Sequence, residues 1–164
     1  MQLPDAEDLL AQLAQTMRPH LGTDTALAGI RTGGAWVAQR LHAVLGLAQP
    51  VGAIDVSFYR DDFERIGLHP EVQPTEIPFT VEGRDIVLVD DVLYTGRTVR
   101  AAINELFDYG RPKSIRLAVL VDRGGRELPV AADFVGAALV PPANQHIVLL
   151  RDANGKFNLS LEGA

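Results

Sequence analysis

Cysteine is absent from this 164-residue chain, which excludes disulfide bonds, thiolate metal ligands and thiol nucleophiles. No apolar run approaches the roughly 18 residues that a membrane-spanning helix needs. The first residues, MQLPDAEDLL, lack the basic and apolar regions of a signal peptide, so we expect a cytoplasmic protein. Basic residues are in the minority: 15 Lys and Arg against 21 Asp and Glu give a net charge of −6. This balance disfavours unspecific attraction to nucleic acid or anionic membranes.

Common nucleotide-binding motifs are missing as well. The sequence contains neither G-x-x-x-x-G-K-[ST] nor G-x-G-x-x-G, which disfavours P-loop and dinucleotide-binding domains. A receiver domain is disfavoured because its acidic pair would lie near the first strand and not around residue 90. The histidines are scattered without the spacing of metal ligands, and we expect none of them to bind a metal: His20, His42, His69 and His146.

Helical and strand-like periods alternate along the chain. The periodicity predicts helices over 5–17, 35–47 and 98–109, and strands over 25–31, 51–59, 86–90, 115–122, 134–139, 147–150 and 157–161. Trp36 is expected to face the core. The continuous apolar run at 86–90 is typical of a central parallel strand. We therefore expect one α/β domain over 1–164, with a central, largely parallel sheet flanked by helices. Ligands of such sheets bind beyond the carboxyl ends of the strands.

Residues 60–79 are rich in charge, proline and glycine and show no clean period. Compact domains rarely contain so long an irregular segment unless it is a lid or a binding loop. We therefore expect a flexible loop here, the alternative being a surface hairpin with no gating role.

The segment 87–99 carries the clearest chemical signal. A buried strand delivers Asp90 and Asp91 to the carboxyl edge of the sheet, and Thr95, Gly96 and Thr98 follow at the start of a helix. Helix N-termini present unpaired N–H groups that bind phosphate, while carboxylates accept hydrogen bonds from sugar hydroxyls. The alternative is that the acids merely end the strand and a threonine caps the helix. The combined spacing favours a sugar-phosphate site.

The pattern Asp90-Asp91-x-x-x-Thr95-Gly96-x-Thr98 after an apolar strand resembles the phosphoribosyl diphosphate (PRPP) motif of type I phosphoribosyltransferases. Further segments resemble the PyrR family, whose members are pyrimidine operon regulators and uracil phosphoribosyltransferases. These segments run through most of the chain: Gly29–Gly34, Tyr59–Asp62, Gly110–Pro112 and Val119–Pro129. The PRPP motif by itself identifies the superfamily. Its combination with YRDD and VDRGGRELP is more specific.

The resemblance implies a type I phosphoribosyltransferase fold with a small hood and a flexible loop over the site. It implies conversion of uracil and PRPP to UMP and pyrophosphate, with Mg²⁺ carried on PRPP and no metal fixed by the protein. Asp90 and Asp91 are the expected catalytic residues. The PRPP-binding motif would comprise Val87, Leu88, Val89, Asp90, Asp91, Val92, Leu93, Tyr94, Thr95, Gly96, Arg97, Thr98 and Val99.

Other roles follow from the same resemblance. Arg31, Thr32 and Gly33 would form the pyrophosphate loop, and Tyr59 and Arg60 the root of the flexible loop. The region that meets uracil would comprise Val121, Asp122 and Arg123. Tyr94 stands where many purine phosphoribosyltransferases have an acid, so no carboxylate base is assigned at that position.

The resemblance also implies regulation of pyrimidine biosynthesis (pyr) genes in response to pyrimidine nucleotides, and a homodimer or homotetramer. An alternative is a UMP- and PRPP-sensing regulator that binds pyr leader mRNA and has only weak transferase activity. Two departures from the family pattern bear on this alternative. The glycine-rich loop often ends Lys-Thr-Arg-Gly in the family, where this chain has Arg31-Thr32-Gly33-Gly34. A second loop often reads Arg-Gly-His-Arg in the family. In this chain Gly125 takes the place of the histidine, between Gly124 and Arg126.

Overall fold

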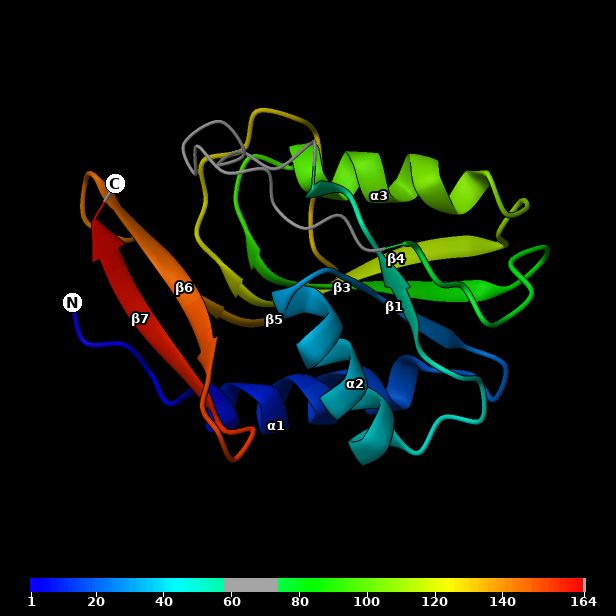
Figure 1. The fold of residues 1–164 in the computed structure, drawn as a ribbon, viewed down its shortest axis with the longest axis horizontal. Helices are drawn as coiled ribbons and strands as arrows, with labels where there is room; N and C mark the ends of the chain where they lie inside the picture. Colours follow the sequence, from blue (N-terminus) through cyan, green and yellow to red (C-terminus); the bar gives the residue numbers. More distant parts are fainter. Residues whose placement is uncertain (58–73, 164) are drawn as a thin grey trace.

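The computed structural model describes residues 1–57 and 74–163 (Figure 1). The helices are α1 (Ala6–Met17), α2 (Gly33–Leu45) and α3 (Arg97–Phe107), with a short 3₁₀ helix, η1 (Arg18–His20), after α1. The strands are β1 (Ala26–Ile30), β2 (Gly52–Ile54), β3 (Asp85–Leu93), β4 (Ser114–Asp122), β5 (Phe134–Ala138), β6 (Gln145–Arg151) and β7 (Phe157–Gly163). Among these residues, no helix has the length and apolarity needed to cross a bilayer.

The central sheet has five strands in the order β2-β1-β3-β4-β5. Every pairing within it is parallel, and β3 lies between β1 and β4. Because all the strands run the same way, the loops that follow β1, β3 and β4 meet at one edge. The predicted α/β class with a largely parallel central sheet is confirmed.

Helices cover both faces of this sheet (Figure 1), with α1 and α2 on one side and α3 on the other. Successive side chains of a strand point to opposite faces, so β3 contributes to two separate cores. Val87 and Val89 pack with α1 and α2, whereas Ile86 and Leu88 pack with α3. All four side chains are fully buried, which explains why this strand reads as a continuous apolar run.

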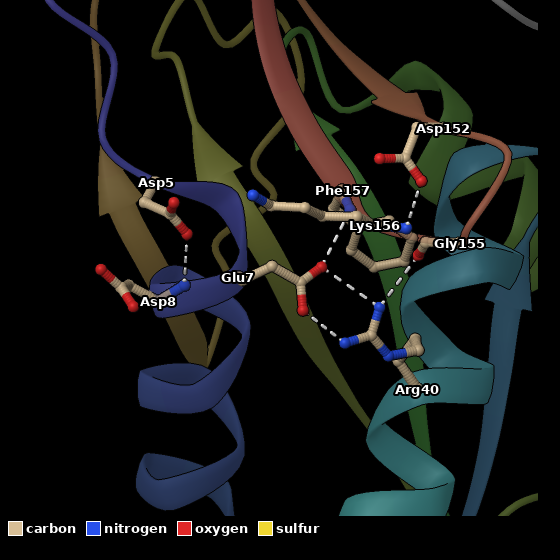
Figure 2. Close-up of polar contacts among 8 residues, drawn as sticks. All are labelled: Asp5, Glu7, Asp8, Arg40, Asp152, Gly155, Lys156 and Phe157. Atoms are coloured by element: carbon tan, nitrogen blue, oxygen red, sulfur yellow. Dashed lines mark hydrogen bonds and ion pairs between the residues drawn. The ribbon is translucent and has the colours of Figure 1, made fainter.

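A separate antiparallel hairpin, β6–β7, borders the sheet and is tied to both N-terminal helices (Figure 2). Glu7 of α1 forms an ion pair with Arg40 of α2, and its carboxylate accepts a hydrogen bond from the Phe157 N–H at 2.8 Å. Arg40 also donates to the Gly155 carbonyl at 3.2 Å and lies 4.8 Å from the centre of the Phe157 ring. This contact fixes the turn end of the hairpin against α1 and α2.

The strand predicted over 51–59 is too long: β2 ends at Ile54. Beyond it, side chains replace the sheet ladder, since the Asp55 N–H donates to the Thr75 hydroxyl at 3.0 Å and the Ser57 N–H donates to the Asp55 carboxylate at 2.9 Å. The remaining predicted helices and strands lie within about two residues of the observed elements at most ends, the usual uncertainty of such boundaries. Trp36 is only partly buried, with the Arg151 guanidinium 4.4 Å from its ring centre.

Candidate functional site

The loops after β1, β3 and β4 and one end of the β6–β7 hairpin enclose a cavity of about 580 Å³. Its lining mixes carboxylates, hydroxyls and guanidinium groups with a few apolar side chains. The lining residues are Ile30, Arg31, Asp90, Asp91, Val92, Tyr94, Thr95, Arg97, Thr98, Arg123, Glu127, His146, Ile147, Val148, Glu162 and Gly163. The cavity thus lies where the parallel sheet predicts a ligand site.

Two adjacent carboxylates of β3 line this cavity. Asp90 is buried, with 7% of its surface exposed, and its Oδ1 accepts a hydrogen bond from the Asp91 N–H at 2.9 Å. Asp91 is half-buried, and its Oδ1 accepts from the Val92 N–H at 2.8 Å. Each acid therefore uses one oxygen for the backbone that follows it. Both carboxylates also line the cavity.

The N-terminus of α2 packs directly against this acidic pair. A Cβ atom at Gly33 would lie 2.1 Å from Oδ2 of Asp91, and one at Gly34 would lie 2.5 Å from the carbonyl oxygen of Val89. Only glycine fits such close approaches of backbone and side chain. The glycines after β1 therefore bring the unpaired N–H groups of a helix start next to the carboxylates.

The turn between β3 and α3 is built from Thr95 and Gly96. Thr95 is buried; its hydroxyl accepts a hydrogen bond from the Arg97 N–H, and its carbonyl oxygen accepts from the N–H groups of Glu127 and Leu128. Gly96 has a φ of +94°, a left-handed conformation that favours glycine. This turn places Thr98 and the start of α3 at the cavity, and helix starts of this kind are typical of phosphate sites.

The loop after β1 supplies a guanidinium to the same cavity. Arg31 follows the strand, and its backbone N–H donates to the Ile54 carbonyl at 2.9 Å. Its side chain donates to the Pro74 carbonyl at 3.1 Å and lies 3.9 Å from the Glu76 carboxylate. The peptide bond between Arg31 and Thr32 is cis. These contacts place the Arg31 guanidinium beside Pro74 and Glu76.

The loop after β4 is held together by Asp122 and Arg126. Arg126 donates to the Asp122 carboxylate at 2.6 Å, to the Tyr94 carbonyl at 2.8 Å and to the Val130 carbonyl at 2.8 Å. Burial of Asp122 opposes its ionisation, but the hydrogen bonds from Arg126 and the Gly124 N–H, with the Arg126 charge, hold its pKa below the ordinary value. Asp122 and Arg126 thus stabilise the loop that positions Arg123.

Arg123 extends from this loop along the cavity wall. Its backbone N–H donates to the Leu93 carbonyl at 3.0 Å, and its guanidinium carbon lies 3.7 Å from the centre of the Tyr94 ring. The guanidinium also contacts Nδ1 of His146 at 3.2 Å. His146 comes from the hairpin and had no signal in the sequence, since its contact with Arg123 depends on tertiary structure.

The predicted site residues fall into several groups. From the PRPP motif, the cavity is lined by Asp90, Asp91, Val92, Tyr94, Thr95, Arg97 and Thr98, and Arg31 and Arg123 join them. Leu93, Gly96 and Val99 line a small hollow that shares Asp90, Thr95 and Thr98 with the cavity. Others support the site from the core or from behind the lining: Val87, Leu88, Val89, Val121, Asp122 and Gly33. Thr32 is exposed at the N-cap of α2 and does not line the cavity. Tyr59 and Arg60 lie outside the described residues, as does most of the predicted loop 60–79.

Within the described residues, no group of three or more His, Cys, Asp or Glu side chains could hold a metal ion. The cavity does contain the Asp90 and Asp91 carboxylates. Mg²⁺ is often bound through one or two carboxylates together with waters and substrate phosphates, so these residues fit an ion that arrives with a diphosphate.

A fold and cavity of this kind define a class of enzymes, and comparison with known proteins gives the same class. A family model described as a phosphoribosyl transferase domain matches residues 2–149. A hypoxanthine-guanine phosphoribosyltransferase from Bacillus anthracis superposes with a TM-score of 0.67 at 20% identity, over 85% of this chain and 83% of that one. A purine phosphoribosyltransferase from Pyrococcus horikoshii gives 0.60 at 28% identity, over 80% and 82%. The chain therefore belongs to the phosphoribosyltransferase family.

Within that family it belongs with the PyrR proteins. The chain is 54% identical over 166 residues to the bifunctional protein PyrR of Pseudomonas entomophila (strain L48), covering 99% of this chain and 94% of that protein. It is 52% identical to the bifunctional protein PyrR of Pseudomonas syringae pv. tomato, covering 99% and 95%. The family predicted from the PRPP motif, YRDD and VDRGGRELP is confirmed.

Proposed function

We propose that this protein transfers the 5-phosphoribosyl group of PRPP to uracil, giving UMP and pyrophosphate, and that it regulates expression of the pyr operon in response to pyrimidine nucleotides. The observation that carries the transferase proposal is one cavity with the Asp90–Asp91 pair on one strand end and the Thr95–Thr98 turn next to it. Membership of the PyrR family supports both halves of the proposal.

We assign each part of PRPP to residues in this cavity or next to it. The Asp90 and Asp91 carboxylates accept hydrogen bonds from the ribose hydroxyls, and the Thr95–Thr98 turn with the start of α3 binds the 5′-phosphate. Arg31, Thr32 and Gly33 bind the pyrophosphate. Mg²⁺, when bound with PRPP, neutralises part of the diphosphate charge.

Chemistry at the anomeric carbon needs no protein nucleophile. A bond forms between N1 of uracil and C1 of the ribose while the bond from C1 to the pyrophosphate oxygen breaks, and N1 loses its proton. Positive charge develops on the sugar ring in the transition state. The Asp90 and Asp91 carboxylates stabilise that charge and hold the ring in place, so positioning and electrostatics supply the catalysis.

Regulation would use the same cavity, with UMP as the sensed nucleotide and pyr leader mRNA as the partner. The PyrR relatives are named bifunctional, which supports a second function beside the transferase. We propose that the protein acts as a homodimer or homotetramer. If regulation dominates, transferase activity would be weak while UMP binding persists.

Conversion of labelled uracil to UMP by the purified protein with PRPP and Mg²⁺ tests the transferase, with cytosine and hypoxanthine as control bases. Uracil-specific turnover is the expected result. Binding to pyr leader RNA, measured with and without UMP over a salt series, tests regulation; it should tighten with UMP and weaken steeply with salt. Equal affinity for control RNA would argue against the regulatory half.

A further inference from the structure

Arg123, Tyr94 and His146 form a stacked group on the cavity wall, built from three separate elements. Arg123 follows β4, Tyr94 follows β3, and His146 lies on β6 of the hairpin. The Arg123 guanidinium rests on the Tyr94 ring at 3.7 Å, and its Nη1 lies 3.2 Å from Nδ1 of His146. All three residues line the cavity.

The chemistry of this contact fixes the direction of its hydrogen bond. A guanidinium carries only donors, so Nδ1 of His146 must be the acceptor. This contact requires the tautomer of His146 that has no proton on Nδ1. The Tyr94 ring restrains one face of the guanidinium, and the hydrogen bond to His146 restrains its rotation over that ring.

Arg123 also has donor capacity to spare. Its Nε atom is buried and makes no hydrogen bond with any described residue. Its Nη groups carry further N–H donors beyond the one that faces His146, and a bound molecule with a carbonyl oxygen in the cavity would accept from them. Uracil has two such oxygens, and Arg123 is the residue of the expected uracil region that lines the cavity.

We propose that His146 is a positioning residue for base recognition, which holds the Arg123 guanidinium so that it donates to a carbonyl oxygen of uracil. The inference rests on the proposed transferase function and adds a specificity-determining contact to it. The hairpin therefore takes part in recognition through a side chain that orients Arg123.

The test compares the unmodified protein with His146→Leu, which removes the acceptor, and His146→Asn, which keeps an acceptor near Nδ1. His42→Leu is the matched control, because His42 lies on α2 outside the cavity and contacts the Gln49 carbonyl. We expect His146→Leu to raise KM for uracil by about tenfold or more, the effect of losing one hydrogen bond to a charged group. KM for PRPP and the thermal midpoint should change little, and His146→Asn should restore most of the uracil KM.

The outcomes separate this inference from the function on which it rests. No uracil turnover by the unmodified protein would overturn the transferase proposal and this inference with it. Turnover with an unchanged uracil KM in His146→Leu would overturn the inference alone. A parallel rise in KM for PRPP, or a defect that His146→Asn shares in full, would indicate a merely structural role and would also overturn it.

Discussion

Gly125 packs against Tyr94 so closely that a Cβ at position 125 would lie 2.6 Å from Cε1 of the ring. Its φ of +84° is also in the left-handed region, where side chains are disfavoured. A histidine, which the PyrR family often has here, would require Tyr94 or the loop to move. Tyr94 supports the Arg123 guanidinium on the cavity wall. The replacement of the family's histidine by Gly125 is therefore linked to the geometry of that wall.

Neighbouring glycines allow the contact to be separated from backbone strain. Gly124 has a similar φ of +72°, but a Cβ there would meet nothing within 4 Å. We expect Gly124→Ala to cost about 1 kcal/mol of unfolding free energy from strain. Gly125→Ala should cost an additional 1–3 kcal/mol, roughly the range for overpacking, and should raise KM for uracil. Denaturant unfolding and steady-state kinetics measure both effects. Equal costs for the two variants would mean that the Tyr94 contact adds nothing.

Close packing at Gly33 should couple the glycine-rich loop to the carboxylates. Gly33→Ala would place a methyl group 2.1 Å from Oδ2 of Asp91, so the carboxylate must rotate away. We expect KM for PRPP to rise by about tenfold or more, the loss of one charge-assisted hydrogen bond. Gly46→Ala, at the other end of α2 with open space around it, should cost stability and leave the PRPP kinetics unchanged. Matching PRPP kinetics in both variants would count against this coupling.

Removal of the Asp91 charge tests the acidic pair itself. Asp91→Asn keeps an oxygen for the Val92 N–H but loses the negative charge. We expect kcat/KM for PRPP to fall by about 100-fold or more, the scale found when a group that stabilises transition-state charge is removed. Stability should change little. Asp85→Asn, at the start of the same strand, where the Ser114 hydroxyl donates to it at 2.6 Å, is the control. Retained turnover in Asp91→Asn would show that the site is wrongly assigned.

The Glu7–Arg40 contact predicts a pH-dependent contribution to stability (Figure 2). The hydrogen bond from Arg40 outweighs burial, and with the Phe157 N–H and the charges of Arg40 and Lys156 it holds the pKa of Glu7 below its ordinary value. A carboxyl whose pKa is lower in the folded state stabilises above the unfolded value, and this stabilisation is lost as pH falls through the folded value.

We therefore expect Glu7→Gln to cost about 1 kcal/mol at neutral pH, a modest value because both side chains are partly exposed. The difference from the unmodified protein should shrink on acidification below about pH 4. Urea unfolding at several pH values measures it. Asp8→Asn removes an exposed acid from the same helical turn and controls for the helix dipole. A cost that does not vary with pH would contradict the ionic origin of the contact.

The local sequence pattern was sufficient to predict structure where one short segment contains all the residues that form the pattern. The apolar run of β3, the acids that follow it and the glycine turn before α3 predicted both the strand and the candidate site. The strand predicted over 51–59 was wrong because β2 ends where the Thr75 hydroxyl and the Asp55 carboxylate take over its backbone partners. Thr75 lies 20 residues from Asp55 in the chain, and no local period reports such a contact.

By itself, the sequence determined the α/β class, because periodicity and turn chemistry act over a few neighbouring residues. The family followed from the resemblance of the PRPP motif, YRDD and VDRGGRELP, and the roles of the motif residues stay predictions. The tertiary structure alone decided which side chains complete the cavity wall. His146 meets Arg123 across 23 residues of chain, and Glu7 meets the Phe157 N–H across 150. Such contacts depend on how the hairpin packs against the helices and the sheet. That packing depends on hydrophobic burial between segments that lie far apart in the sequence.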